Sequence, residues 1–338
     1  MPIPLIVGGI AAAAGLLGVK KAYDAHETNK RAESINSRAE YEISKAKEDA
    51  EKRRTECQKS LENLGSAKLN VLNQGIMPFV RSFKKIKNIE LRDSAGLNEL
   101  SKFNLTKEEL ADMEKIGSLA ESIVNGATGG VAAGALAAIG AYGAASSFGV
   151  VVGTGTLISS LSGVAATNAT LAFLGGGALS AGGFGMAGGM AVLGSVVVGP
   201  ALAVMGFVMN SKAEENLEKA RANRAEAEKI VEQCRTISST CLCIKMRCDT
   251  ISGILNKLRS RLMSAVNTVE RIVSRHDDGT GAADFRSFSE DEKKSLAAAA
   301  ALAKSIKSIL DTPVLTQDGK LTMQSEIIAE NDYDDDMD

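Results

Sequence analysis

The chain has 338 residues, a formal net charge of −2, 45% hydrophobic residues, only 4% aromatic residues and no tryptophan. Because basic residues are not clustered with aromatic ones, this composition argues against a nucleic-acid-binding protein. The shortage of large aromatic side chains argues against a conventional globular core and favours long helices packed through small residues. We therefore predict an all-α fold.

Residues 1–19 form an apolar stretch, MPIPLIVGGIAAAAGLLGV, which is followed by Lys20 and Lys21. A cleavable signal peptide carries its positive charges before the apolar stretch, so we expect no such signal and synthesis in the cytoplasm. The stretch is slightly short for a membrane span, which needs about 20 residues. We predict an apolar N-terminal helix that either inserts at a membrane interface or is buried as a hydrophobic cap.

Residues 20–75 are predicted to form one long exposed helix, because charges of both signs alternate and Gly65 is the one glycine before Gly75. Small residues recur at steps of three and four from Ala22 to Val71. Such a seam buries little area per turn, so this helix needs a partner helix to be stable.

Shorter helices are predicted over residues 76–125, interrupted by Pro78 and Gly96. Thr106 and Glu109 have the spacing of a capping box, in which each side chain bonds the backbone N–H of the other residue. A helix is therefore expected to begin just after Thr106.

The segment from Ser122 to Ser211 contains 90 residues without Asp, Glu, Lys or Arg, and it holds most of the 33 glycines. In a bilayer every backbone group needs an internal partner, so a long uncharged segment favours helices that enter lipid or pack tightly together. We predict that residues 126–209 form a glycine-rich, membrane-inserting helical hairpin. The alternative is a compact glycine-rich core that never meets lipid.

Glycines four residues apart in this segment allow helix backbones to touch, and a proline would kink the second span. A leucine at one of these glycines is expected to block close packing. The residues predicted to carry membrane insertion and helix packing are Gly126, Gly130, Gly134, Gly149, Gly153, Gly185, Gly189 and Pro200.

Residues 212–275 are predicted to form a second long helix with coiled-coil packing, because apolar residues step by three and four without a break. The predicted seam contains Ile230, Cys234, Ile237, Cys241, Ile244, Cys248, Ile251, Leu255, Leu258 and Leu262. The two long helices have similar lengths, so we predict long antiparallel coiled-coil helices flanking the glycine-rich hydrophobic hairpin. Both ends of the uncharged segment would then connect to the same end of the helix pair, so the segment would cross a bilayer an even number of times.

An amphipathic helix is predicted over residues 289–311, because Ser289 and Glu292 form a capping box and Pro313 follows the helix. The sequence HDDGTGAAD before it is predicted to be a loop. Residues 312–338 end in DYDDDMD, and we predict an acidic disordered tail.

Motifs for catalysis are missing from the chain. The glycine-rich stretches carry no GK[ST] or GxSxG sequence, and the two histidines, His26 and His276, lie outside them. We therefore predict no enzyme activity, catalytic residue, cofactor or small-molecule substrate.

Four of the five cysteines lie between Cys234 and Cys248. Three of these recur every seven residues, about 10 Å apart along a helix, which is too far for one tetrahedral metal ion. We predict no metal site and buried thiols in the seam. A disulfide to Cys57 and redox sensing are the alternatives.

Long charged helices on either side of an uncharged, glycine-rich segment resemble the plan of α-helical pore-forming proteins of the cytolysin A and apolipoprotein L types. Residues 166–204, ATNATLAFLGGGALSAGGFGMAGGMAVLGSVVVGPALAV, are similar to a segment of uncharacterised bacterial proteins, which implies no activity. The inserting element of the cytolysins is shorter and poorer in glycine, so no functional residue is carried over.

Together these features predict a membrane-associated or membrane-inserted oligomer that forms a pore or disrupts a membrane. Its expected partners are the lipid bilayer and further copies of the chain, and not nucleic acid. The alternative is a scaffold or membrane-shaping coiled-coil assembly without pore activity.

Overall fold

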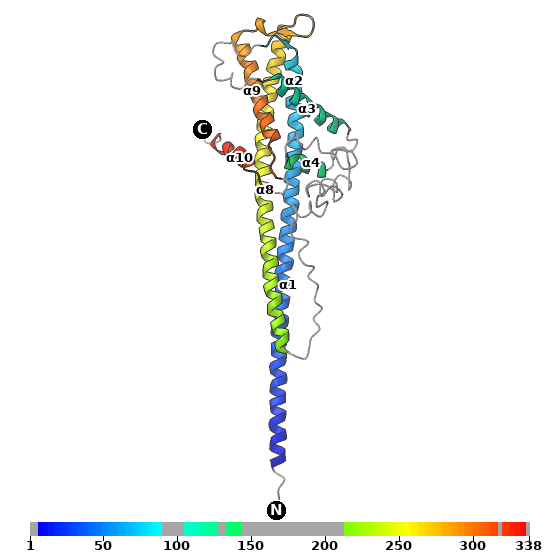
Figure 1. Cartoon of the computed structure of the whole chain (residues 1–338), viewed down its shortest axis with the longest axis vertical. Coiled ribbons are helices and arrows are strands. Elements are labelled where there is room, and N and C mark those ends of the chain that lie inside the picture. The colour runs from blue at the N-terminus through cyan, green and yellow to red at the C-terminus, as the bar shows by residue number, and fades with distance from the viewer. Residues whose placement is uncertain (1–5, 90–104, 127–132, 143–212, 317–319, 336–338) are drawn as a thin grey trace, which may run out of the picture. The chain divides into compact units, whose positions relative to one another are not determined.

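The computed structural model describes residues 6–89, 105–126, 133–142, 213–316 and 320–335 (Figure 1). Of the described residues 87% are helical and 3% lie in strands, so the predicted all-α class is confirmed. The helices are α1 (Ile6–Val71), the π-helix η1 (Leu72–Ile76), α2 (Met77–Lys84), α3 (Lys107–Gly126), α4 (Ala133–Ala141), α8 (Ala213–Arg275), the 3-10 helix η5 (Phe285–Ser287), α9 (Glu290–Asp311) and α10 (Met323–Asp335).

The chain divides into two compact units, and both α1 and α8 contribute to each. The first unit comprises Met1–Arg54 and Val196–Thr240, and the second comprises Thr55–Ser195 and Cys241–Asp338. The second unit also contains two short strands, β1 (Ile86–Lys87) and β2 (Ala283–Asp284), which pair in parallel.

In the first unit α1 and α8 run parallel. The amide of Asn216 donates to Asn29 Oδ1 over 2.9 Å, and seven residues later Asn223 donates to Asn36 Oδ1 over 3.2 Å. Further along, Ser238 Oγ donates to Asp49 over 2.8 Å. Residue numbers rise together on both helices, which occurs only when the helices point the same way.

In the second unit the direction is the same. The thiol of Cys57 on α1 hydrogen-bonds with Cys241 on α8. Beyond α1, Arg259 donates to Gln74 of η1 over 3.1 Å, and Ser82 of α2 donates to Glu270 over 3.1 Å.

The predicted antiparallel pairing is therefore wrong. Steps of three and four residues look alike in both chain directions, so the apolar seam does not select an orientation, which is shown instead by the order of the hydrogen-bonded pairs. The prediction of an even number of membrane crossings rested on antiparallel helices and loses that premise.

The seam predicted for α8 lies on the buried face of the helix. The buried residues are Ile230, Cys234, Ile237, Cys241, Ile244, Cys248, Ile251, Leu255 and Leu262, and Leu258 is half-buried. On α1 the small and polar seam residues Ala32, Asn36, Ala39, Ala50 and Cys57 are buried as well.

The predicted helices over residues 1–19 and 20–75 form one uninterrupted helix from Ile6 to Val71, and residues 1–5 lie outside the described part. The side chains of residues 6–22 lie outside the described part, so insertion or burial of the N-terminal stretch stays a prediction. The helical path then continues through η1, where the Met77 N–H donates to Leu72 O, into α2. Pro78 lies in the first turn of α2, where its missing N–H does least harm.

Both predicted capping boxes are confirmed. Glu109 N donates to Thr106 Oγ1 over 3.1 Å while Thr106 N donates to the Glu109 carboxylate over 2.9 Å. Ser289 and Glu292 exchange the equivalent bonds at the start of α9. Both helices therefore begin where the sequence predicts.

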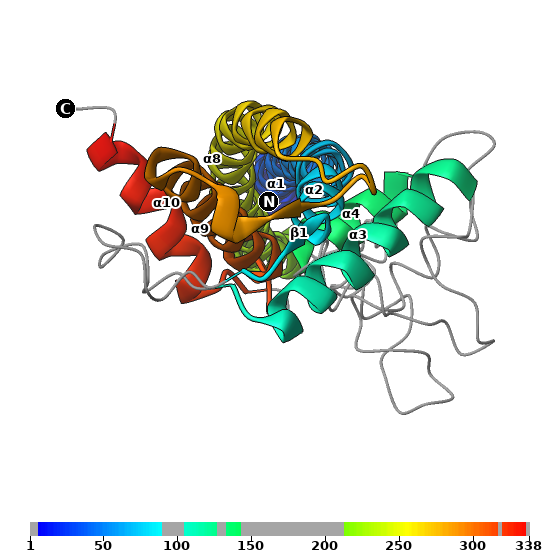
Figure 2. The ribbon, with the colours of Figure 1, turned by 90° about the horizontal axis from the view of Figure 1, so that it is seen from above.

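The prediction of a disordered tail over residues 312–338 is wrong for α10. Thr322 caps this helix, since its hydroxyl accepts from Ser325 N over 3.3 Å and donates to Pro313 O. Arg247 of α8 lies 3.6 Å from Glu326. Figure 2 shows α10 outside α9, on the side of the unit opposite to α3. Local capping and an ion pair order this acidic sequence, which composition alone does not reveal.

The parallel direction can be tested by cross-linking in a variant whose native cysteines are replaced by serine. We expect the pair Asn29→Cys and Asn216→Cys to form a disulfide under mild oxidation, because these side chains face each other. The control pair Asn29→Cys and Ser238→Cys should stay reduced, because Ser238 lies opposite Asp49 in the parallel arrangement. Cross-linking of the control pair in preference to the first would contradict the parallel fold; the readout is peptide mass spectrometry.

Candidate functional site at the start of the uncharged segment

The structure describes two parts of the uncharged segment: the end of α3 and residues 133–142, which include α4. Gly126 is the last residue of α3, and Gly134 lies in α4. The other predicted packing residues lie outside the described residues, as does the predicted hairpin: Gly130, Gly149, Gly153, Gly185, Gly189 and Pro200. Within the described residues, no helix combines the length and the apolarity that crossing a bilayer requires.

The helix α4 contacts α1 backbone to backbone. A Cβ added to Gly65 would lie 1.9 Å from the carbonyl oxygen of Leu136, and one added to Gly140 would lie 2.0 Å from that of Leu61. Side-chain carbons never approach oxygens so closely, so both positions require glycine. Ala137 and Ile139 of α4 are also buried. Glycine at the two facing positions therefore permits this contact.

Lys68, one turn after Gly65, fastens the end of α4. Its side chain is fully buried, and Nζ donates to Tyr142 O over 2.7 Å and to Gly140 O over 3.3 Å. The last carbonyls of a helix lack partners within the helix and carry partial negative charge, so a cation there is favourable.

The carbonyl between these two is also occupied. Ala141 O accepts from the backbone N–H groups of Val314 and Leu315, over 2.9 and 3.0 Å. Three consecutive carbonyls at the end of α4 thus have partners from α1 and from the segment after α9. We call Gly65, Lys68, Gly140 and the carbonyl groups of residues 140–142 the α4 joint.

Burial lowers the pKa of Lys68 to about 8, while Cys248 and Asp311 act in the opposite direction. A cavity near the joint, lined by Leu72, Met113 and Asp311 among others, holds only about 10 Å³, room for about one water molecule. The joint thus has the features of a fastening point rather than of a substrate site.

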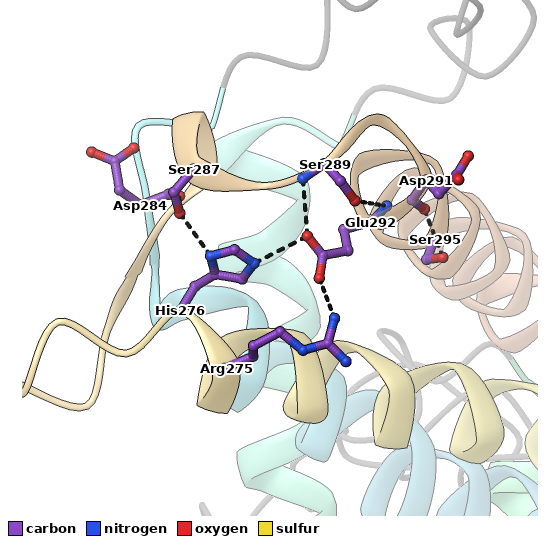
Figure 3. A network of polar contacts seen from close by, with 8 residues as sticks. All are labelled: Arg275, His276, Asp284, Ser287, Ser289, Asp291, Glu292 and Ser295. Carbon is purple, nitrogen blue, oxygen red and sulfur yellow. Dashed lines mark hydrogen bonds and ion pairs between the residues drawn. The ribbon is translucent and has the colours of Figure 1, made fainter.

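A second polar cluster joins the end of α8 to the start of α9 (Figure 3). His276 Nδ1 lies 3.1 Å from Ser287 Oγ, and Nε2 lies 3.0 Å from Glu292 Oε2. Serine, histidine and a carboxylate are the residue types of a hydrolytic triad. Sequence motifs gave no sign of this cluster, because its members come from separate turns.

The hydrogen bonds do not follow the order that a triad requires. Ser287 Oγ donates its one hydrogen to Asp284 O over 2.7 Å, so this hydrogen is not directed at His276 as a triad requires. Glu292 also accepts from Ser289 N over 2.9 Å and from Arg275 over 2.6 Å. The cluster therefore connects α8 to α9, and we assign it no catalytic step.

The cysteines Cys57, Cys234, Cys241 and Cys248 are buried, whereas Cys243 is exposed. Burial raises the pKa of Cys248 to about 12. In the described part of the chain, no three His, Cys, Asp or Glu side chains are placed to hold a metal ion together. The absence of cofactors and metals stays a prediction.

Comparison with protein-family models, with curated proteins and with solved structures found no match. The resemblance to α-helical pore-forming proteins therefore stays an expectation. The geometry defines the class: an all-α protein built on a parallel pair of long helices, with the start of its uncharged segment fastened to α1.

Lys68 and Gly140 were not predicted from the sequence. Gly65 stands out as the one glycine in its predicted helix before Gly75, and Lys68 is a charged residue directly beside the seam residue Ala67. These two features of the sequence point to Gly65 and Lys68, which are the part of the joint that α1 supplies.

Lys68→Met should remove a pH dependence of stability. The pKa of Lys68 is 10.5 in the unfolded chain and about 8 in the folded protein. Below pH 8 both states hold the proton, so the burial penalty is constant. As the pH rises from 8 towards 10.5 the folded state releases the proton first, so Lys68 raises the free energy of unfolding by about 3 kcal/mol.

The free energies of unfolding of wild type and Lys68→Met are measured in urea below pH 8 and at about pH 10. The change in their difference between the two pH values reports the effect. The exposed residue Lys59 supplies the control, since Lys59→Met should follow the wild type. Parallel curves for wild type and Lys68→Met would show that Lys68 is not buried as described.

Glu292→Gln should destabilise the cluster at the start of α9 by about 1–2 kcal/mol, because the carboxylate accepts from Ser289 N, Arg275 and His276. The Ser289 N–H, followed by His276, holds the pKa of Glu292 below its usual value. Its contribution is therefore present above the unfolded-state pKa and is lost as the pH falls through the folded-state pKa. Asp291→Asn is the control, because that side chain is 94% exposed. Equal losses in both variants, measured by urea unfolding, would refute the network.

Proposed function

We propose that the protein inserts into membranes through its uncharged segment and acts as an oligomeric pore-forming or membrane-disrupting effector. One observation carries this proposal: the 90 residues from Ser122 to Ser211 contain no Asp, Glu, Lys or Arg. About 20 apolar residues span a bilayer as a helix, so the segment has length for more than one span. Synthesis in the cytoplasm and later association with a membrane belong to the same proposal.

The helices outside this segment have the character of a water-exposed support. Their outer faces carry ion pairs between successive turns, such as Arg38–Glu42 on α1 and Arg224–Glu228 on α8, both at 3.0 Å. Such exposed pairs contribute little stability but keep the surface hydrated. Charged helices and an uncharged segment in one chain support a protein that stays partly in water and enters lipid locally.

The α4 joint supports a defined starting point for insertion. It holds α4 by glycine contacts and carbonyl hydrogen bonds, and these contacts need no large apolar side chain. The rest of the segment is then available for lipid, where each buried CH₂ contributes roughly 0.8 kcal/mol and close glycine contacts can join copies of the chain.

A scaffold or membrane-shaping assembly without pore activity is the second candidate. It is favoured by Tyr23 and Tyr41, which are both 67% exposed on α1. They are 18 residues apart, about five helical turns, so they share one face of the helix. Exposed aromatic side chains on one face suit contact between copies of the chain.

The test combines flotation of purified protein with liposomes on a density gradient and release of a dye trapped in the same liposomes. Flotation with release is the expected result. Flotation without release would favour the scaffold. Protein that stays at the bottom of the gradient would refute membrane insertion and make the uncharged segment a protein core.

Two glycine variants sharpen this experiment. Gly65→Ala places a Cβ against Leu136 O and should loosen α4, so we expect faster dye release. Gly253→Ala in α8 is the matched control, because no atom lies within 4 Å of the added Cβ. It should leave release unchanged and stabilise the helix by about 0.5–1 kcal/mol. Equal dye release by Gly65→Ala and Gly253→Ala would show that the α4 joint does not control insertion.

A further inference from the structure

Cys57 of α1 and Cys241 of α8 lie opposite each other in the seam of the second unit. Their exposed fractions are 2% and 6%, and the two thiols are hydrogen-bonded. A disulfide needs two sulfurs on facing positions with their Cβ atoms about 4 Å apart. Contact between thiols on two neighbouring helices places both sulfurs in the region where such a bond forms.

No other cysteine competes for Cys57. Cys248 follows Cys241 by seven residues, about 10 Å further along α8, so one thiol of α1 cannot contact both. Cys243 is exposed and lies off the seam. Cys234 belongs to the first unit, where Lys47 is its charged neighbour. The parallel register thus singles out one pair.

We propose that Cys57 and Cys241 are a reversible disulfide site that ties α1 to α8, with a low-molecular-weight disulfide as the oxidant. This site is independent of the membrane function proposed above, because its chemistry requires no lipid.

The reaction balances as two thiol–disulfide exchanges. One cysteine thiolate attacks a sulfur of the oxidant, which forms a mixed disulfide and expels one small thiolate. The second cysteine then attacks the protein sulfur of that mixed disulfide and expels the other small thiolate. The protein loses two electrons and two protons, and the oxidant is reduced to two thiols.

The surroundings of the pair set the rate of this reaction. The hydrogen bond with Cys241, and then burial, raise the pKa of Cys57, so the reactive thiolate is scarce while the helices are closed. Oxidation therefore follows a transient separation of α1 from α8. Once formed, the bond holds the two helices in parallel register until a reductant cleaves it.

The experiment treats the full-length protein with oxidised glutathione, blocks remaining thiols with iodoacetamide and maps non-reduced peptides by mass spectrometry. We expect one linked peptide pair containing Cys57 and Cys241, which disappears on reduction. Cys57→Ser and Cys241→Ser should each abolish it, whereas Cys243→Ser should not. A link from Cys57 to Cys248, or glutathione on Cys243 with no internal link, would overturn the proposal.

Thermal unfolding provides a second measurement. Oxidation should raise the Tm of the wild type by several degrees and leave that of Cys57→Ser unchanged, because a bond across a long loop restricts the unfolded chain. An unchanged Tm in protein that carries the linked peptide would overturn the claim that the bond ties α1 to α8. Because neither measurement contains lipid, failure of the liposome test would leave this result standing.

Discussion

The pairing of α1 with α8 in parallel is the constraint on which the other contacts depend. The pairs Asn29–Asn216 and Asn36–Asn223 fix the register in the first unit, because a buried amide needs a hydrogen-bonding group opposite it. The register has a cost, since Asn36 Nδ2 is buried without a hydrogen-bond partner. An open pocket of about 230 Å³ lies beside these amides. This seam therefore favours a definite alignment over maximal stability.

The α4 joint differs from ordinary helix packing in what holds it. Besides buried apolar side chains such as Ile139, it has close glycine contacts and hydrogen bonds to the final carbonyls of α4, with a buried ammonium group as donor. Directional contacts of this kind fix one geometry, and all of them are lost when the distance between α4 and α1 increases. Separation of α4 from α1 would therefore break the glycine contacts and the carbonyl hydrogen bonds together.

The seam residues could be predicted from the sequence because burial repeats every three or four positions, but the repeat carries no direction. Each long helix also has two asparagines seven residues apart in the first unit, but equal spacing matches in either direction, so the direction is seen only in the structure. Lys68 and Gly140 could not be joined from the sequence, because 72 residues separate them and no local pattern connects them. The helix α10 was not predicted, because acidic composition indicates a solvated segment and does not reveal the helix cap at Thr322.

Parallel pairing also determines when the helices can meet during synthesis. The hydrogen bonds between α1 and α8 in the first unit connect residues 187 to 189 positions apart. No short loop can nucleate such a pair, so its formation is expected to be slow. At about 5–20 residues per second, α1 waits roughly 10–40 s on the ribosome for its partner. A seam rich in alanine and asparagine suits this interval, because it exposes little that would aggregate before α8 is made.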